Sequence, residues 1–328
     1  METVPDSTSA GLPAVPTARP ATAADPVAAG GPPAVHRVSA PRSLRGLLGV
    51  DPKAPARAEI PNDRKLLQRR ISRMVHKAAI DFDMLADGDR VMVCMSGGKD
   101  SYALLHFLQQ TQARSPIRFE IIAVHLAQGH PGFPLDKLED YLKACGSPYH
   151  IEHYDTYTVV KEMLQPGKTT CSLCSRLRRG ILYDTAKRLG CNKVALGHHR
   201  DDILATLMLN LFFCGQLKAM PAKLRADDGY NTVIRPLAYV PESWIVAFKE
   251  FEGWPVIPCS LCSQQPDQKR TQMEQLLAEI DRTWPGSLPS ALHAVQNLHP
   301  RFLLDRAQWD FDAVPASATG DADEDAFE

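Results

Sequence analysis

Residues 90–108, RVMVCMSGGKDSYALLHFL, constrain the fold more than any other stretch of the chain. The apolar run 90–95 contains two β-branched valines and leads into a pair of glycines, which is typical of a buried parallel strand. Asp100 and Ser101 are favoured N-cap residues, and apolar side chains follow at helical spacing, so a helix is predicted directly after the glycines. A strand, a glycine turn and a helix N-terminus form an anion-binding site, to which Lys99 adds a full positive charge.

The six residues SGGKDS match neither GxxxxGK(S/T) nor GxGxxG, so the two commonest phosphate loops are not present at this position. An ordinary strand-to-helix turn is the plain alternative, because glycine pairs are common in such turns. The motif resembles the PP-loop of the ATP pyrophosphatases, which have the adenine nucleotide α-hydrolase-like fold. The resemblance implies that the β,γ-pyrophosphate of ATP is held, while a substrate oxygen is adenylylated, by Ser96, Gly97, Gly98, Lys99, Asp100 and Ser101.

The composition is that of a globular protein in a reducing compartment. No apolar stretch reaches the roughly 18 residues that a membrane helix needs, and the N-terminus lacks the regions of a signal peptide. Eight cysteines in 328 residues, four of them in CxxC pairs, suit metal or redox chemistry better than a disulfide scaffold. We therefore expect a cytoplasmic protein. The acidic residues concentrate at the C-terminus, which leaves the rest of the chain mildly basic and compatible with a nucleic-acid substrate.

Three segments are predicted. Residues 1–60 are rich in proline and alanine and poor in large apolar side chains, so we expect a disordered tail rather than a transit peptide. Residues 61–311 form the ATP-binding domain, and 312–328 a disordered acidic tail. The domain begins with a predicted amphipathic helix, whose basic face either meets an RNA backbone or is simply solvated. The basic residues of this face are Arg64, Lys65, Arg69, Arg70, Arg73 and Lys77.

Strands alternate with helices along the domain, which predicts an α/β fold with a doubly wound parallel sheet and added N- and C-terminal helices. Strands are predicted at 90–95, 119–126, 149–153, 193–196 and 233–237. Further helices are predicted from 135 and at 156–164, 172–189, 203–213, 241–251, 266–282 and 288–298, with a loop at 214–231. SGGKDS and GHHRDD (197–202) each follow a strand. Ligands of such sheets bind at the carboxyl ends of strands, so we expect both motifs to face one pocket.

Two CxxC pairs, 171–174 and 259–262, are separated by 84 residues. A thiolate pair at this spacing is the usual half-site for zinc or an iron–sulfur cluster, and two pairs can converge on one metal. Zinc ribbons separate their pairs by only roughly 15–20 residues, so the long separation favours a site built inside the fold. Nearby arginines would stabilise thiolate or hold phosphates. The other cysteines, Cys94, Cys145, Cys191 and Cys214, are expected to be small buried hydrophobes.

Further blocks extend the resemblance. The chain resembles the tRNA 2-thiocytidine synthetases in six sequence blocks. They are SGGKDS, GHHRDD, PGFP (131–134), GKTTCSLCSRLRRGIL (167–182), IRPLAY (234–239) and IPCSLC (257–262). The match covers roughly residues 62–312. It implies a tRNA cytidine 2-sulfurtransferase that acts at anticodon-loop position 32 and uses ATP, Mg²⁺ and a 4Fe–4S cluster. It also implies three cluster ligands, which match Cys171, Cys174 and Cys262, with Cys262 preferred to Cys259. The family often has an aspartate where this chain has Ala127.

The chemistry suggests roles for other residues. Adenylylation turns the C2 oxygen of a pyrimidine into a leaving group that sulfide displaces. We expect Asp100 and Asp201, or Asp202 in its place, to position Mg²⁺ or the reacting groups. Arg178 is expected to stabilise charge on the transferring phosphate. The adjacent His198 and His199 look catalytic but suit supporting or core positions as well. The implied partners are the tRNA anticodon loop and a sulfur donor such as a cysteine desulfurase, with a homodimer left open.

Other protein classes share parts of this pattern. A PP-loop enzyme that thiolates a tRNA uridine, or a relative of the sulfonucleotide reductases, would have a similar loop and cysteines. An RNA-binding protein with a metal–cysteine site and no ATP chemistry would have no need of Lys99 or Asp100, so the complete loop argues against it. The CxxC spacing alone does not separate zinc from iron.

Overall fold

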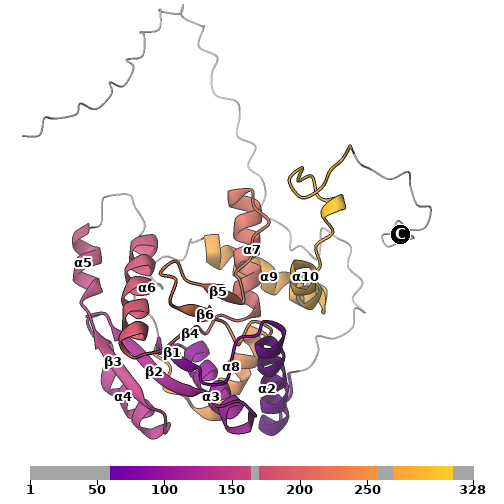
Figure 1. The fold of residues 1–328 in the computed structure, drawn as a ribbon. Coiled ribbons are helices and arrows are strands. Elements are labelled where there is room, and N and C mark those ends of the chain that lie inside the picture. Colours follow the sequence, from indigo (N-terminus) through magenta and orange to yellow (C-terminus); the bar gives the residue numbers. More distant parts are fainter. Residues whose placement is uncertain (1–59, 164–169, 258–268, 313–328) are drawn as a thin grey trace, which may run out of the picture. The chain divides into compact units, whose positions relative to one another are not determined.

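The structure, a computed structural model, describes residues 60–163, 170–257 and 269–312. Apart from Ile60 and Asp312, the two tails predicted to be disordered lie outside these ranges, as does the second CxxC pair. Within them, a six-stranded sheet is flanked by helices (Figure 1). No helix in this part of the chain combines the length and the apolar character that crossing a membrane requires.

The strands follow the order β3-β2-β1-β4-β6-β5. All neighbouring pairs are parallel except β5 and β6, which are antiparallel. The predicted doubly wound sheet is therefore confirmed, but the segment 214–231, predicted to be a loop, contains the edge strand β5. Its three residues, KLR, are too few to show a strand period. The strands are β1 (Arg90–Cys94), β2 (Glu120–Ala127), β3 (Tyr149–His153), β4 (Lys193–Ala195), β5 (Lys223–Arg225) and β6 (Thr232–Ile234).

Every predicted helix is present, with ends within about three residues of those predicted. Asp100 and Ser101 are not caps, however: they lie in the first turn of α3, whose N-cap is Gly98. The helices are α2 (Arg64–Asp81), α3 (Lys99–Arg114), α4 (Leu135–Ala144), α5 (Thr156–Met163), α6 (Thr170–Arg188), α7 (Arg200–Cys214), α8 (Glu242–Glu252), α9 (Lys269–Thr283) and α10 (Ser287–Gln296), followed by the 3₁₀ turn η2 (Pro300–Phe302).

Alternate residues of the central strands face opposite sides of the sheet, as the two-residue period of a strand requires. Val91 and Val93 of β1 join the core formed with α2, α3 and α8. Met92 joins a second core with Ala186 of α6 on the other face. Because both faces are covered, β1 and β2 are apolar along nearly their whole length. The C-terminal helices α9 and α10 pack against α7 around a third, smaller core.

The topology brings the two polar motifs together. β1 and β4 are parallel neighbours, so the loops that follow them leave the same edge of the sheet and lead into α3 and α7. The strand order reverses here, because β2 lies on the other side of β1, and such switch points leave a crevice for ligands. The two loops touch at Gly197, where a Cβ would lie 3.0 Å from the carbonyl carbon of Asp100.

Candidate active site

The turn between β1 and α3 is shaped to receive an anion. Gly97 has a φ of 85°, a left-handed value that other residues rarely adopt, and its carbonyl accepts a hydrogen bond from the Ile257 N–H at 2.9 Å. Among the described residues, no side chain caps the start of α3. The backbone amides at this helix start and the positive end of the helix dipole therefore point toward a ligand. This geometry fits the phosphate-binding role expected of residues 96–101.

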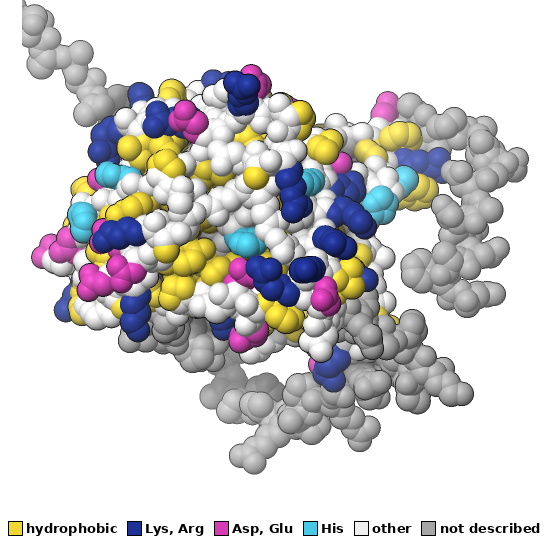
Figure 2. Space-filling view, turned by 90° about the horizontal axis from the view of Figure 1, so that it is seen from below, with side chains coloured by type: hydrophobic (Ala, Val, Ile, Leu, Met, Phe, Trp, Pro, Cys, Tyr) yellow, Lys and Arg dark blue, Asp and Glu magenta, His cyan; other side chains and the backbone are white. Residues whose placement is uncertain are grey.

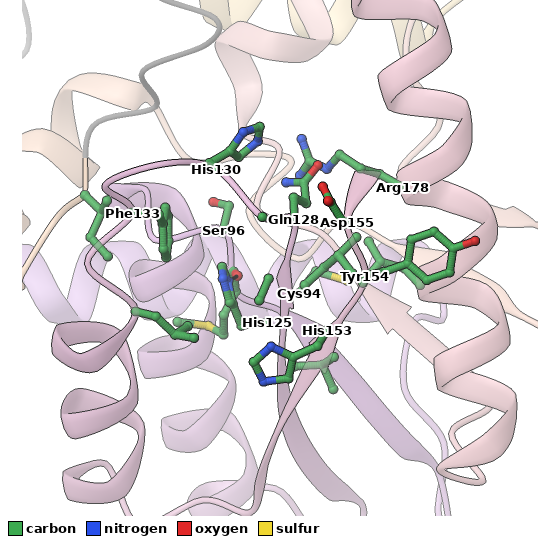
Figure 3. A pocket seen from close by; sticks show the side chains of 18 of the residues that line it. Cys94, Ser96, His125, Gln128, His130, Phe133, His153, Tyr154, Asp155 and Arg178 are labelled. Carbon is green, nitrogen blue, oxygen red and sulfur yellow. Dashed lines mark hydrogen bonds between the residues drawn. The ribbon is translucent and has the colours of Figure 1, made fainter. Parts of the chain in front are cut away.

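A cavity of about 590 Å³, called here the first cavity, lies against this turn (Figure 3). The carboxyl ends of β1, β2 and β3 and one side of α6 form its walls. Ser96 and Gly98 of the loop reach it, and so do Cys174 and Arg178 of α6. Its volume lies within the range of small-molecule sites, which is roughly 300–1,000 Å³. The first cavity therefore joins the phosphate loop to the first CxxC helix.

Arg178 brings positive charge to the first cavity. Its side chain is half-buried, and among the described residues it has no hydrogen bond or ion pair. Burial lowers the pKa of His125 and of His130 in the same cavity, and the Arg178 charge lowers both further. A guanidinium with unused donors suits an anionic group such as a phosphate. The position thus agrees with the role expected of Arg178.

A second cavity, of about 700 Å³, is lined by Lys99 and Asp100 of the loop and by residues of GHHRDD. The Lys99 ammonium lies 3.1 Å from Asp100 Oδ2 and 2.8 Å from Glu242 Oε1. The expectation that the two motifs face one pocket therefore holds for Lys99 and Asp100, whereas Ser96 and Gly98 face the first cavity. The carboxylates that line the second cavity are Asp100, Asp201, Asp202, Glu242, Glu274 and Asp281.

One carboxylate oxygen of Asp100 has no hydrogen-bond partner among the residues that the structure describes. Its Oδ1 is buried and accepts no hydrogen bond, although His199 Nε2 approaches it to 3.8 Å. Burial raises the pKa of the Asp100 carboxyl, and the nearby Lys99 and His199 only partly offset that effect. An acceptor of this kind is costly to bury, and a cation or a proton donor would satisfy it.

Asp201 and Asp202 are tied into the helix starts. Asp202 accepts a hydrogen bond from the His199 N–H at 3.0 Å, which completes a capping box for α7, and it also pairs with Arg270 of α9. Asp201 accepts from the Glu242 N–H of α8 at 2.8 Å. These bonds hold Asp201 and Asp202 in place and join α7 to α8 and α9.

The two histidines of GHHRDD take supporting positions. His198 Nδ1 accepts a hydrogen bond from Arg235 Nε at 3.2 Å. Burial, followed by the Arg235 charge, lowers the pKa of His198 to about 4, so the ring is neutral near pH 7. His199 is buried as the N-cap of α7, and its ring accepts from the Asp202 N–H. Neither ring lines the first cavity, where the loop meets α6.

Comparison with known proteins is consistent with this geometry. Residues 64–255 match the PP-loop domain family. A tRNA-cytidine(32) 2-sulfurtransferase from Paracidovorax citrulli is 50% identical over 276 residues, which cover 84% of this chain and 88% of that protein. A protein of the same name from Tolumonas auensis is 52% identical over 252 residues, which cover 77% of this chain and 83% of that protein. The chain belongs to the tRNA-cytidine(32) 2-sulfurtransferase family. Its PP-loop is therefore an ATP-binding element.

A solved structure shares the fold of this sulfurtransferase family member. The U34-tRNA thiolase NcsA from Methanococcus maripaludis, solved with its 4Fe–4S cluster, superposes with a TM-score of 0.56 at 23% identity. The match covers 72% of this chain and 81% of the thiolase. It agrees with the mostly parallel sheet and flanking helices described above.

The cysteines expected to bind a cluster in this sulfurtransferase are described only in part. Cys171 lies in the first turn of α6, and Cys174 lies one turn later, where it lines the first cavity. Cys259 and Cys262 lie outside the described ranges. Within those ranges, no three His, Cys, Asp or Glu side chains are grouped as a metal site. The prediction of three ligands therefore stays a prediction.

Several lining residues had no recognisable signal in the sequence. Cys94, expected to be a buried hydrophobe, reaches the first cavity, but burial raises the pKa of its thiol to about 12, so it stays protonated. His125 and Gln128 also line this cavity, as does Ala127 at the carboxyl end of β2. His125 and Ala127 lie on β2 among mostly apolar residues, and Gln128 directly follows the strand. The expectation of burial is wrong for Cys214, which is exposed at the end of α7.

Proposed function

We propose that the chain is an ATP-dependent tRNA-cytidine(32) 2-sulfurtransferase, which adenylylates the C2 oxygen of cytidine 32 and replaces it with sulfur. Its family membership supports the substrate and the overall reaction. The observation that carries the proposal further is the first cavity, around which the phosphate loop, the Arg178 guanidinium and the Cys174 thiol meet. An ATP activation step and a sulfur delivery step need those three features in one place.

The proposed reaction has two displacements. The cytidine C2 oxygen attacks the α-phosphorus of ATP, and the bond to the β-phosphate breaks, which releases pyrophosphate and leaves AMP bonded to that oxygen. Sulfide then adds to C2, and the C2–O bond breaks with the electron pair leaving on AMP. The product has a C2=S bond. No net oxidation or reduction of the base occurs, because one divalent atom replaces another.

The loop and Arg178 fit the first displacement. The α3 N-terminus and Lys99 would hold the leaving pyrophosphate, where backbone donors need no reorganisation as negative charge develops. Arg178, on the opposite wall of the first cavity, would stabilise the α-phosphate as it is transferred. Asp100, whose buried Oδ1 is unpartnered, is suited to help bind Mg²⁺, an ion that takes one or two carboxylates and completes its shell with phosphate and water oxygens. Asp201 would act as the second carboxylate.

The sulfur step concerns the cysteines. We propose that Cys171, Cys174 and Cys262 hold a 4Fe–4S cluster, which when bound supplies a place for the sulfide outside the protein's own thiols. The lining of the first cavity by Cys174 supports this, because sulfur must reach the same base that ATP activates. A sulfur donor such as a cysteine desulfurase would reload the site. We also propose a cytoplasmic location, where tRNA is modified.

Nucleoside mass spectrometry tests the proposal directly. The chain is expressed in a bacterial strain whose tRNA lacks 2-thiocytidine because its own enzyme is deleted, and digested tRNA is analysed. Wild type is expected to restore 2-thiocytidine, whereas Lys99→Ala and Cys174→Ala are not. Cys214→Ala, at an exposed cysteine outside both cavities, is the matched control and should behave as wild type. Restoration of a thiouridine in place of 2-thiocytidine would assign the chain to the uridine thiolases.

A further inference from the structure

His125 is a buried polar residue in the wall of the first cavity. It lies in β2, is only 3% exposed, and its ring stacks on Phe133 with centroids 5.0 Å apart (Figure 3). Its Nδ1 lies 2.7 Å from the carbonyl oxygen of Met95, the residue that precedes the phosphate loop. One ring nitrogen is therefore used to join β2 to the start of the loop.

The proton position on this ring follows from that contact. A carbonyl oxygen only accepts hydrogen bonds, so Nδ1 must be the protonated nitrogen and the donor. Burial lowers the pKa of His125, and although the Met95 hydrogen bond opposes this, the Arg178 charge lowers the pKa further. The ring is thus neutral near pH 7. In a neutral ring with a proton on Nδ1, Nε2 is an acceptor.

That acceptor has no partner among the described residues. Nε2 is buried and makes no hydrogen bond. A buried acceptor left unpaired costs on the order of 1–3 kcal/mol, and such groups are rare enough to require an explanation. A second ring in the same cavity has the same feature, because Nδ1 of His130 is also buried and unpartnered. Two imidazole nitrogens of one cavity are therefore left without partners by the residues that the structure describes.

We infer that His125 Nε2 accepts a hydrogen bond from a donor group on the nucleoside of bound ATP, and that His125 is a specificity-determining residue of the first cavity. The donor is either the 6-amino group of the adenine or a ribose hydroxyl. Phe133, whose ring stacks on the imidazole, lines the same cavity, so the nucleoside would bind beside these two rings. This inference rests on the proposed placement of ATP in the first cavity.

Two substitutions separate the two nitrogens of the ring. In His125→Asn, the side-chain amide nitrogen takes the place of Nδ1 and still donates to Met95, but nothing replaces the Nε2 acceptor. His125→Phe keeps an aromatic ring against Phe133 and removes both nitrogens. His150→Asn is the matched control, because that histidine pairs with Glu152 on β3 at 2.9 Å and does not line the cavity.

The experiment measures equilibrium binding of ATP, ITP, 2′-deoxy-ATP and 3′-deoxy-ATP to the anaerobically purified full chain by calorimetry without tRNA. ITP lacks the 6-amino group, and each deoxy compound lacks one hydroxyl. Wild type and His150→Asn are expected to bind one of the three analogues about tenfold more weakly than ATP. That gap should shrink to less than about twofold in His125→Asn and in His125→Phe. The analogue that loses its penalty identifies the donor.

Two results would overturn the inference. If wild type discriminates against no analogue, or if the gap persists in both His125 variants, Nε2 does not contact the nucleoside. Ala127→Trp provides a separate control, because an indole at this lining position would project into the cavity and occupy part of it. Normal ATP binding by Ala127→Trp would place the nucleotide elsewhere, and the sulfurtransferase assignment would then stand on the tRNA analysis alone. Circular dichroism and thermal unfolding confirm that each variant is folded.

Discussion

Gly197→Ala tests whether the contact between the two loops sets the geometry of ATP binding. The added Cβ would lie 3.0 Å from both the carbonyl carbon and the carbonyl oxygen of Asp100, and 3.2 Å from the Ser101 nitrogen. All three are backbone atoms in the first turn of α3, so no side-chain rotation can relieve the contact. Ordinary carbon contacts begin near about 3.5 Å. The turn after β4 and the α3 start must therefore separate by roughly half an ångström.

That displacement should have two measurable effects. Overpacking of this kind costs about 1–3 kcal/mol, which for a domain of this size lowers the melting temperature by roughly 2–10 °C. It also moves the phosphate loop, and misplacement of reacting groups by about 1 Å can cost 10²-fold in rate, so a shift half as large should lower kcat/KM by about tenfold. The loss is expected mainly in kcat, because the ligand still reaches the first cavity.

The assay is pyrophosphate release in the presence of tRNA, measured alongside thermal unfolding. Gly180→Ala is the matched control, since Gly180 lies in α6, is exposed, and a Cβ there would meet nothing within 4 Å. Alanine at that helix position should leave activity unchanged and raise stability by up to about 1 kcal/mol. Wild-type activity and melting temperature in Gly197→Ala would refute the argument that this contact positions the loop.

Three further predictions follow from the same structure. Arg178→Ala should lower kcat/KM by about 10²-fold. The melting temperature should change little, because the guanidinium has no partner in the described part of the chain. Arg179→Ala, at the exposed neighbouring position, is the control, and an equal loss of activity in both variants would refute a specific role for Arg178. Burial alone would raise the pKa of Asp202, but His199 and Arg270 bring it below its usual 3.8, so its contribution to stability is present above that pH and is lost as the pH falls through the lowered value. Melting temperatures between pH 3 and 6 should therefore fall less steeply for Asp202→Asn than for wild type, and identical slopes would contradict this. Figure 2 shows a group of Lys and Arg side chains on one face of the molecule. On α2, the exposed Lys65, Arg69 and Arg73 make no hydrogen bond or ion pair within the described residues. Replacing these three by Gln should weaken tRNA binding and reduce its salt dependence by up to about three ions, whereas an unchanged slope would show that this face is merely solvated.

Much of the fold was predictable because its signals are local. Apolar runs bounded by glycine predict β1 and β4, and helical spacing predicts α2 and α7. The PP-loop is a contiguous motif, so its residues could be named in advance. β5 could not, because a three-residue edge strand depends on its partner β6 rather than on its own sequence. The N-cap of α3 was misjudged for a related reason. Asp100 is a good capping residue in isolation, but the glycine turn starts the helix earlier and sends that carboxylate into the second cavity.

The wall of the first cavity shows the limit of sequence patterns more clearly. β2 has the pattern of an ordinary buried strand, and although His125 is a polar residue between Val124 and Leu126, FEIIAVHL does not show whether its ring is a satisfied core group or part of a site. Its place in the proposed site comes from two contacts with other segments, the Met95 carbonyl and the Phe133 ring, and from its position in the cavity wall. Only the folded chain decides which of its two nitrogens is left unpaired. A motif can therefore locate the phosphate loop, whereas the pocket proposed to receive the nucleoside has to be found in three dimensions.

The phosphate loop borders two cavities that carry opposite charge, and this arrangement bears on the release of pyrophosphate. Ser96 and Gly98 face the first cavity with Arg178, whereas Lys99 and Asp100 face the second among six carboxylates. A pyrophosphate held at the α3 start would lie between a cationic wall and an acidic one. On release, the like charge of those carboxylates would oppose its retention in the second cavity unless Mg²⁺ accompanied it. The metal would then retain the product as well as assist catalysis, so pyrophosphate should inhibit the enzyme more strongly as free Mg²⁺ is raised. Inhibition that is independent of Mg²⁺ would contradict this arrangement.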